Sequence, residues 1–369
     1  MRVPFYDIQA QYTELAQDLD AAVLDVLRSG TYTISGGKQN PAFEQEFAEY
    51  HQVKHAIAVH SGTDALRIAM DAVGIGHGDE VITTAFTFVA STETIVQTGA
   101  TPVFVDIDPR TFQIDVAKIE AAITPRTKAI LPIHLFGQLV DVQPLMELAC
   151  AHNLLILEDA AQAVGSRYQN KPAGNFGIAA GYSFYVTKNL GAAGDGGMIT
   201  TNDDGVAERC RSIRVHGMGR ERYYYDHLGY TGRLDEMQAA VLRIKLRKLE
   251  EWNERRARLA AIYLEEMAGA GVELPHVIEG NHHTWHQFCL RSTRRDALQA
   301  FLKERGVDSM IHYPVPLHFH SPYERFGQGP GSLPETERAA LEILSLPIHP
   351  HLSKEAVRYT AGLVREFAG

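Results

Sequence analysis

The sequence predicts an α/β protein with a mainly parallel sheet, followed by a smaller α+β domain. From about residue 55 to residue 200, short apolar segments typical of buried strands alternate with amphipathic segments typical of helices. Such alternation is characteristic of βαβ units, whose strands lie parallel. After about residue 235 the pattern changes to one long helical stretch and then to a mixture of strand and helix signals.

The first part of the chain alternates regularly between the two kinds of segment. Each apolar segment is short enough for a strand, and each amphipathic segment is long enough for a helix. We expect strands at residues 55–60, 78–84, 101–107, 127–134 and 154–159, and helices at 64–76, 91–100 and 141–153.

The second part begins with a long helical pattern over residues 236–268, of the kind that often connects two domains. Behind Gly271, strand signals at 286–292 and 308–316 mix with helix signals at 295–306 and 353–367. We therefore expect a large domain over residues 1–245 and a small C-terminal domain over residues 246–369.

Composition and charge exclude several classes of protein. The formal net charge of −10 argues against a nucleic-acid-binding protein, which would show a basic patch. No apolar stretch approaches the roughly 20 residues of a membrane helix, and the first residues lack the apolar region of a signal peptide. The three cysteines lie far apart in the sequence, so neither a disulfide framework nor a CxxC metal site is indicated. We expect a cytoplasmic enzyme without a bound metal.

Lys188 stands in front of a glycine-rich loop, in the segment SFYVTKNLGAAGDGG at 183–197. A P-loop is excluded because its lysine follows the glycines and is followed by serine or threonine, whereas Asn189 follows here. A lysine in a loop is most often a solvated surface residue. Its neighbours in the fold decide between that interpretation and a chemical role.

Three further segments follow expected strands, where ligands bind in open α/β sheets. Asp159 ends the strand at 154–159, although a helix N-cap would also explain it. SGTDAL, 61–66, opens a helix, so it is either an anion site or ordinary capping by Ser61 or Thr63. Phe88 follows another strand and either stacks on a flat ligand or packs in the core.

Taken together, these residues supply a lysine, an acid, an anion-binding helix start and an aromatic ring. This set matches the needs of pyridoxal 5'-phosphate, which takes a Schiff-base lysine, an acid paired with its pyridinium nitrogen and a phosphate cradle. The acid keeps the ring nitrogen protonated, so that the ring accepts electrons. The lysine must lose its proton to act as nucleophile and base.

The chain resembles the sugar aminotransferases of the DegT–StrS family, which have the aspartate-aminotransferase fold. The resemblance runs nearly from end to end. It rests on ordered blocks that include SGTDAL, GDEVITTAFTFVAS, EDAAQAVG, SFYVTKNLGAAGDGG, GYTGRLDEMQAAVLRIKL, MIHYPVPLH and LSLPIHPHL. It implies a fold-type I pyridoxal-phosphate-dependent transferase whose large domain has a seven-stranded sheet and binds the cofactor.

The resemblance also implies roles for individual residues. Lys188 matches the catalytic Schiff-base lysine. Dehydratases of the family have histidine there, so the lysine favours transamination. The implied cofactor-binding residues are Gly62, Thr63, Asp64, Phe88, Asp159, Gln162, Ser183 and Thr231. Thr231 stands where the family usually has an asparagine that reaches the partner subunit's cofactor phosphate, and its shorter reach predicts weaker cofactor retention.

The implied reaction uses L-glutamate as amino donor and a nucleotide-linked keto sugar as acceptor, with ping-pong kinetics in a homodimer with shared active sites. The blocks around residues 236–257 and 310–318 resemble members that act at C3 of a 3-keto sugar. His312 and Tyr313 match positions that, with Arg233, line the sugar site of those members from the neighbouring subunit. Interface packing for His312 and Tyr313, and an ion pair for Arg233, are the alternatives. A 4-keto-sugar aminotransferase and an inactive cofactor-binding regulator also remain as alternatives.

Overall fold

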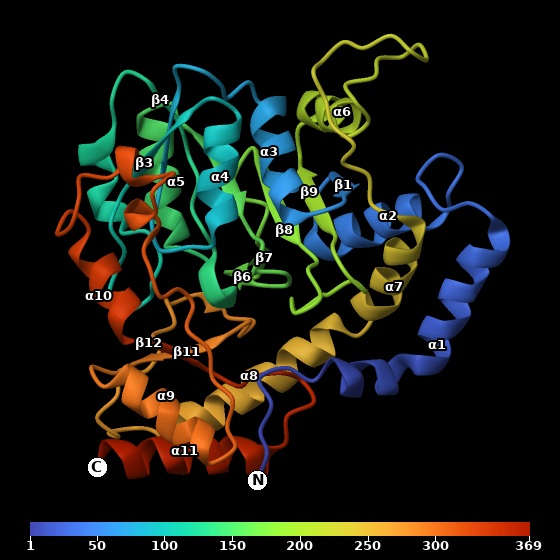
Figure 1. Ribbon diagram of the computed structural model, residues 1–369. Helices are drawn as coiled ribbons and strands as arrows, with labels where there is room; N and C mark the ends of the chain where they lie inside the picture. Colours follow the sequence, from blue (N-terminus) through green and yellow to red (C-terminus); the bar gives the residue numbers. More distant parts are fainter.

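The computed structural model describes residues 1–369 and has a seven-stranded sheet at its centre (Figure 1). The strand order is β1–β9–β8–β5–β4–β2–β3. β3, β2, β4, β5 and β8 run parallel, and β9 runs antiparallel to both β8 and β1. The predicted α/β class is confirmed. The strands are β1 (His55–Val59), β2 (Glu80–Thr83), β3 (Thr101–Phe104), β4 (Thr127–Ile130), β5 (Leu155–Asp159), β8 (Ala179–Ser183) and β9 (Gly197–Thr201).

The sheet is buried on both faces, which explains why its strands are apolar throughout. In β1, Ile57 and Val59 join one hydrophobic cluster, whereas Ala56 and Ala58 join another on the opposite face. This is the two-residue alternation of a strand. One face carries α3 (Gly62–Ala72), α4 (Val89–Gln97) and α6 (Asp204–Ile213), and the other carries α2 (Gln39–His51), α5 (Val142–Ala151) and α7 (Glu236–Leu246).

The strands β8 and β9 are absent from our sequence prediction. The residues of β8 are mostly small, AAGYS, so it lacks the large branched side chains that mark a strand. Gly181 is small because α3 packs directly on it, and a Cβ there would lie 2.8 Å from Cδ2 of Leu66. The same close packing brings the start of α3 against the end of β8, where the predicted site lies.

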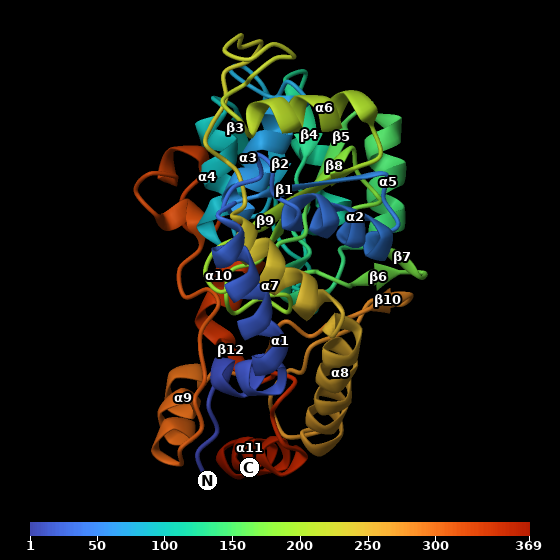
Figure 2. The ribbon, with the colours of Figure 1, turned by 90° about the vertical axis from the view of Figure 1, so that its right-hand side faces the viewer.

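A second body below the sheet is built from the C-terminal residues (Figure 2). β11 (Phe288–Arg291) pairs antiparallel with β12 (Ile343–Leu346), and α8 (Leu249–Glu266), α9 (Arg295–Glu304) and α11 (Lys354–Ala368) share its hydrophobic cluster. Val3 belongs to this cluster too, because it forms a bridge with Val307. The division of the chain at residues 245 and 246 stays a prediction. The remaining elements are α1 (Ile8–Ser29), α10 (Pro334–Glu342), β6 (Arg167–Tyr168), β7 (Lys171–Pro172) and β10 (Asn281–His282).

The long helix expected over residues 236–268 is in fact two helices, α7 and α8. Between them the amide of Lys248 donates to the carbonyl of Lys245 at 3.0 Å, a tighter turn than an α-helix makes. α7 packs against α1 and α2 beside the sheet, whereas α8 packs against α11. A single straight helix would not meet both surfaces. None of the helices is long and apolar enough to cross a membrane.

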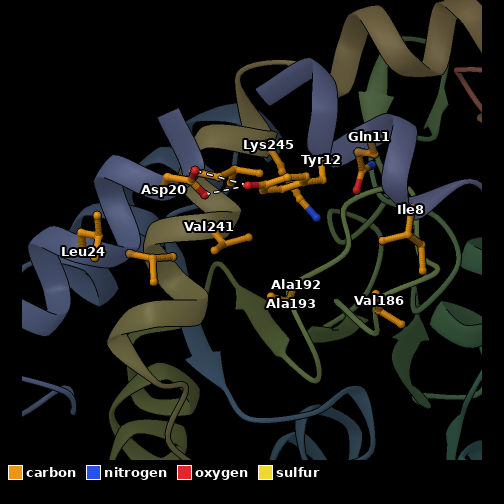
Figure 3. A pocket seen from close by; sticks show the side chains of 12 residues that line it. Ile8, Gln11, Tyr12, Asp20, Leu24, Val186, Ala192, Ala193, Val241 and Lys245 are labelled. Atoms are coloured by element: carbon orange, nitrogen blue, oxygen red, sulfur yellow. Dashed lines mark hydrogen bonds between the residues drawn. The ribbon is translucent and has the colours of Figure 1, made fainter. Parts of the chain in front are cut away.

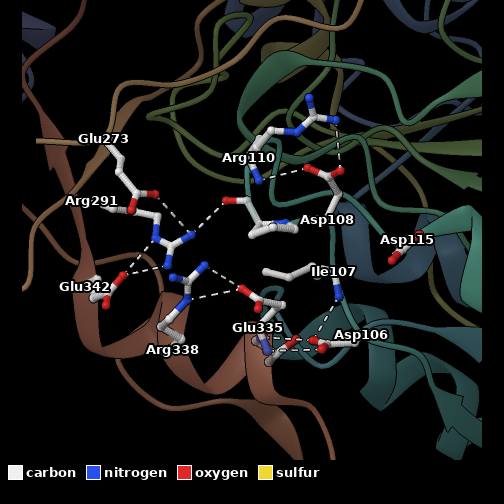
Figure 4. Close-up of polar contacts among 12 residues, drawn as sticks. Asp106, Ile107, Asp108, Arg110, Asp115, Glu273, Arg291, Glu335, Arg338 and Glu342 are labelled. Atoms are coloured by element: carbon white, nitrogen blue, oxygen red, sulfur yellow. Dashed lines mark hydrogen bonds and ion pairs between the residues drawn. The ribbon is translucent and has the colours of Figure 1, made fainter.

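Polar contacts connect the loop after β3 with the C-terminal body (Figure 4). Asp106 accepts hydrogen bonds from the amides of Glu335 at 3.0 Å and Thr336 at 2.8 Å, at the start of α10. The buried guanidinium of Arg291 donates to Glu342 at 2.6 Å and to the carbonyl of Pro109 at 2.8 Å. α10 has no capping side chain of its own, so Asp106 supplies its cap from the loop after β3.

Replacing Asp106 with alanine is expected to lower the free energy of unfolding by about 1–2 kcal/mol, because two amides of α10 lose their acceptor. Thermal and denaturant unfolding of the variant would measure the loss. Asp18→Ala, an exposed position on α1, is the matched control. Equal unfolding midpoints for Asp106→Ala and wild type would contradict this role of Asp106.

Candidate active site

Lys188 lies in a tight turn between β8 and β9. Its amide donates to the carbonyl of Tyr185 at 2.8 Å, and the turn closes so tightly that a Cβ at Gly191 would collide with the carbonyl of Val186. Asn189 fixes the next position by donating to Oδ1 of Asn253 at 2.8 Å and to the carbonyl of Thr284 at 3.0 Å. The glycine-rich segment is therefore a rigid support for the lysine.

Asp159 ends β5, the parallel neighbour of β8, and pairs in register with Gly181. Its buried carboxylate accepts from Oγ of Ser91 at 2.6 Å and from the amide of Ala161 at 3.1 Å. Burial raises the pKa of Asp159, although these hydrogen bonds and the charge of Lys188 oppose the shift. Two adjacent strands thus bring an anchored acid and the lysine turn to the same edge of the sheet.

The amine of Lys188 is packed among protein groups. This burial lowers the pKa of Lys188 to about 8, and the attraction of Asp159 opposes the shift. A lysine whose pKa is lowered by burial holds a useful fraction of neutral amine near neutral pH. Neutral amine is the form that attacks a carbonyl carbon and accepts a proton.

The lowered pKa of Lys188 predicts how covalent attachment of an aldehyde depends on pH. We expect the rate at which pyridoxal phosphate attaches to the apoprotein to rise with pH and to level off above a midpoint near 8, because only the neutral amine reacts. A solvated lysine would place the midpoint near its usual pKa of 10.5. Rates of absorbance change across a pH series would distinguish the two midpoints.

The start of α3 faces the end of β8. Ser61 caps the helix, since its Oγ accepts from the amide of Asp64 at 3.1 Å. A Cβ at Gly62 would lie 2.7 Å from Cβ of Ser183, so only glycine permits this close approach. Capping by Ser61 is confirmed. Phosphate binding by Gly62, Thr63, Asp64 and Ser183 remains a prediction that the positive end of the α3 dipole supports.

Gln162, Tyr313 and Phe88 form a connected group. Nε2 of Gln162 donates to the hydroxyl of Tyr313 at 3.2 Å, and its Oε1 accepts from the amide of Phe136 at 2.7 Å. The ring of Phe88 lies 6.3 Å from that of Tyr313 and is 56% exposed, so core packing does not explain it. Phe86, two residues earlier, is the buried core residue.

Three predicted residues, His312, Thr231 and Arg233, form no hydrogen bond with Gln162 or Phe88. His312 directly precedes Tyr313 in the chain, and its Nδ1 lies 3.0 Å from Oγ of Ser345. Thr231 contacts Nε2 of His216 at 3.0 Å, and Arg233 bridges to Val59 at the end of β1. No hydrogen bond or ion pair joins Thr231 or Arg233 to Lys188 or Asp159 within one chain. Their expected roles in a partner's site stay predictions.

Sequence reasoning missed several residues that support the site. Ser91 holds Asp159, and Thr87 contacts the hydroxyl of Ser91 at 3.0 Å. Hydroxyl residues are frequent in the segment just after β2, but this composition does not show which of them meets Asp159. His286 is also buried, with Nδ1 at 3.2 Å from Oδ1 of Asn189. These residues orient the two reactive side chains.

Glu158, beside Asp159, belongs to the support of the sheet edge. Its carboxylate accepts from Nε2 of His134 at 3.0 Å and from the amides of Gly174, Phe176 and Gly177, each at 2.8 Å. The amide of Val140 donates to Nδ1 of His134, so the imidazole carries its proton on Nε2. Burial favours a higher pKa for Glu158, but these donors outweigh it and hold the pKa below the usual value.

The residues present fit pyridoxal phosphate. Lys188 offers an amine of lowered pKa, and Asp159 offers an anchored carboxylate at the end of the neighbouring strand. Gly62 has no side chain to cover the backbone amides at the start of α3. Lys188 would hold the aldehyde carbon, Asp159 the ring nitrogen and the start of α3 the phosphate.

Comparisons with known proteins agree with this fit. Residues 13–365 match the model of the DegT/DnrJ/EryC1/StrS aminotransferase family. A dTDP-3-amino-3,4,6-trideoxy-alpha-D-glucose transaminase of Streptomyces venezuelae is 46% identical, with 100% of this chain and 96% of that protein covered. A pleiotropic regulatory protein of Geobacillus stearothermophilus is 48% identical, with 100% and 99% covered.

Solved structures give the same result. The crystal structure of S. venezuelae DesV in complex with a ketimine intermediate superposes with a TM-score of 0.97 at 47% identity, covering 100% of this chain and 98% of that one. The shared fold is that of fold-type I pyridoxal-phosphate-dependent enzymes, as the sequence predicted. The protein is an aminotransferase that uses pyridoxal phosphate, and the chain belongs to the DegT/DnrJ/EryC1/StrS aminotransferase family.

Proposed function

We propose that this aminotransferase moves an amino group from L-glutamate to the C3 ketone of a nucleotide-linked keto sugar, in the biosynthesis of an amino sugar. The observation that carries the proposal is the meeting of Lys188 and Asp159 at the ends of adjacent strands, with the lysine's pKa lowered. The S. venezuelae relative, whose name places the amino group at C3, supports the position of the ketone.

In the proposed reaction, pyridoxal phosphate supplies a ring that accepts the electrons left when the donor loses its α-proton. Asp159, held by Ser91, keeps a negative charge beside the ring nitrogen. Nζ of Lys188 takes the α-proton of the donor and passes it to the cofactor. In the second half-reaction the same atom moves a proton in the opposite direction, from the cofactor to the sugar carbon. Phe88 and Gln162, which both lie beside Tyr313, would hold the cofactor ring in place.

We further propose that the site is completed by a second copy of the chain. Thr231 and Arg233 match cofactor and sugar positions, yet neither bonds to the Lys188 group of its own chain. A homodimer in which each copy lends these residues to the other would explain both facts. The sugar would then be bound by Arg233 of the partner subunit together with His312 and Tyr313 of the chain that holds Lys188.

The test is the absorbance spectrum of the purified protein with pyridoxal phosphate, recorded before and after L-glutamate. We expect the band of the lysine-bound cofactor to change to that of the amine form, and to return when a 3-keto nucleotide sugar is added. Return only with a 4-keto sugar would favour the 4-keto alternative. A band that no donor changes would favour the regulator, a second candidate that the name of the G. stearothermophilus relative, a pleiotropic regulatory protein, supports.

A further inference from the structure

We propose that Lys245 is a positioning residue that holds the turn carrying Lys188 through the carbonyl group of Gly191. Nζ of Lys245 donates to that carbonyl at 2.7 Å. The inference goes beyond the proposed function and rests on its assignment of Lys188 as the lysine that binds the cofactor. It concerns the geometry of the turn, whatever the sugar substrate is.

α7 presents two polar side chains to this turn. Gln238 and Lys245 lie two helical turns apart, so they share one face of the helix. Oε1 of Gln238 accepts from the amide of Ala193 at 2.8 Å, and Nε2 of Gln238 donates to the carbonyl of Ala193 at 3.3 Å. Gln238 therefore fixes residue 193 while Lys245 fixes residue 191.

Lys245 lies in a mainly apolar groove of about 450 Å³ between α1, α7 and the turn (Figure 3). The only carboxylate lining this groove is Asp20, and it accepts from the hydroxyl of Tyr12 at 3.0 Å. Lys245 thus has a single, uncharged acceptor. Burial lowers the pKa of Lys245 to about 8, which shows that its surroundings disfavour the ammonium form.

A buried ammonium with one carbonyl partner contributes little to folding, since an apolar side chain of similar length costs less to desolvate. Methionine at position 245 would fill the same space beside Val241 and Leu19. The hydrogen bond to Gly191 is what lysine adds. We therefore expect the loss of this hydrogen bond to change the position of the turn and the reactivity of Lys188 more than the stability of α7.

The turn transmits the position of Gly191 to Lys188. Gly191 packs against the carbonyl of Val186, and the amide of Lys188 donates to the carbonyl of Tyr185. The two ends of the turn are therefore in contact with each other. Asn189 ties one side of the turn to α8, and Lys245 ties the other side to α7. Without the Lys245 contact, the turn is tied to α7 only through Gln238 at residue 193, and the amine of Lys188 loses part of its fixed approach to the edge where Asp159 lies.

The test separates binding from covalent attachment in the apoprotein, with Lys245→Met. Pyridoxamine 5'-phosphate, which forms no bond to lysine, measures non-covalent binding. Pyridoxal 5'-phosphate measures the rate of attachment. We expect Lys245→Met to leave the dissociation constant of the amine within about twofold and to slow attachment by roughly 10-fold to 100-fold, the cost of a misplaced reactive group. The unfolding midpoint of the apoprotein should be unchanged or higher.

Lys248→Met is the matched control, because Lys248 follows the same helix directly but is partly exposed and pairs with Glu251. Attachment at the wild-type rate in Lys245→Met would overturn the proposal, as would equal slowing in Lys248→Met. If Lys245→Met is recovered only unfolded, Lys245→Arg decides, since it keeps the donor: a wild-type rate supports the proposal and a slow rate contradicts it. A wild-type protein that attaches no cofactor would instead refute the assignment of Lys188.

Discussion

Replacing Lys188 with alanine is expected to lower the rate at which L-glutamate converts the bound cofactor to its amine form by about 10⁴-fold or more. One atom, Nζ of Lys188, is assigned both the covalent link to the cofactor and the transfer of the α-proton. No other lysine occupies the turn between β8 and β9. A single-turnover absorbance measurement gives the rate directly.

A second measurement on Lys188→Ala is independent of turnover. Borohydride treatment of the wild-type protein with pyridoxal phosphate should leave one cofactor mass attached at residue 188, and the variant should gain none. Lys128→Ala removes an exposed lysine from β4 and serves as the control. A variant that still converts its cofactor at more than about a hundredth of the wild-type rate would disprove the assignment.

Replacing Asp159 with asparagine is expected to slow the same half-reaction by roughly 10²–10³-fold, the usual cost of removing one preorganised charge from a reacting centre. Asparagine keeps the shape of the side chain and can still contact Ser91, but it is neutral beside the ring nitrogen. The loss should therefore appear in the rate of proton removal, with little change in folding.

The pH dependence of attachment gives a second result for Asp159→Asn. The anionic carboxylate favours the protonated form of Lys188 and so raises its pKa, against the larger opposite effect of burial. Removing the charge should move the midpoint of attachment below the wild-type value near 8. Asp18→Asn, on the exposed side of α1, should leave the midpoint and the rate unchanged. A midpoint that moves upward in Asp159→Asn would contradict the pairing.

The sequence predicted the parts of the fold that depend on local pattern. The alternating strands and helices from β1 to β5, α9 and α11 have the apolar periodicity of their elements, and all are present. β8 was missed because its small residues serve the close packing of α3, a tertiary requirement that no local pattern reveals. The break between α7 and α8 was missed for a similar reason, since only the two different packing partners explain it.

The residues of the candidate site likewise include some that the sequence predicts and others that only the structure reveals. Asp159 could be predicted because it ends an apolar strand, and Lys188 because it stands in front of a glycine-rich loop. Ser91 and Lys245 could not, because their functions depend on partners that lie 68 and 54 residues away in the chain. A serine in a helix and a lysine at the end of another have many ordinary explanations. Only the packed structure shows which carbonyl or carboxylate each one meets.

The place of Val3 has a consequence for how the protein is made. Its amide bonds to the carbonyl of Gly306 at 2.8 Å, and its carbonyl accepts from the amide of Asp308 at 3.0 Å. A ribosome adds the intervening roughly 300 residues in about 15–60 s. Throughout that interval residues 3–5 have no partner, while the strands of the central sheet are already synthesised. The segment is therefore translated early and docks late, and the C-terminal body is completed only after translation has passed residue 308.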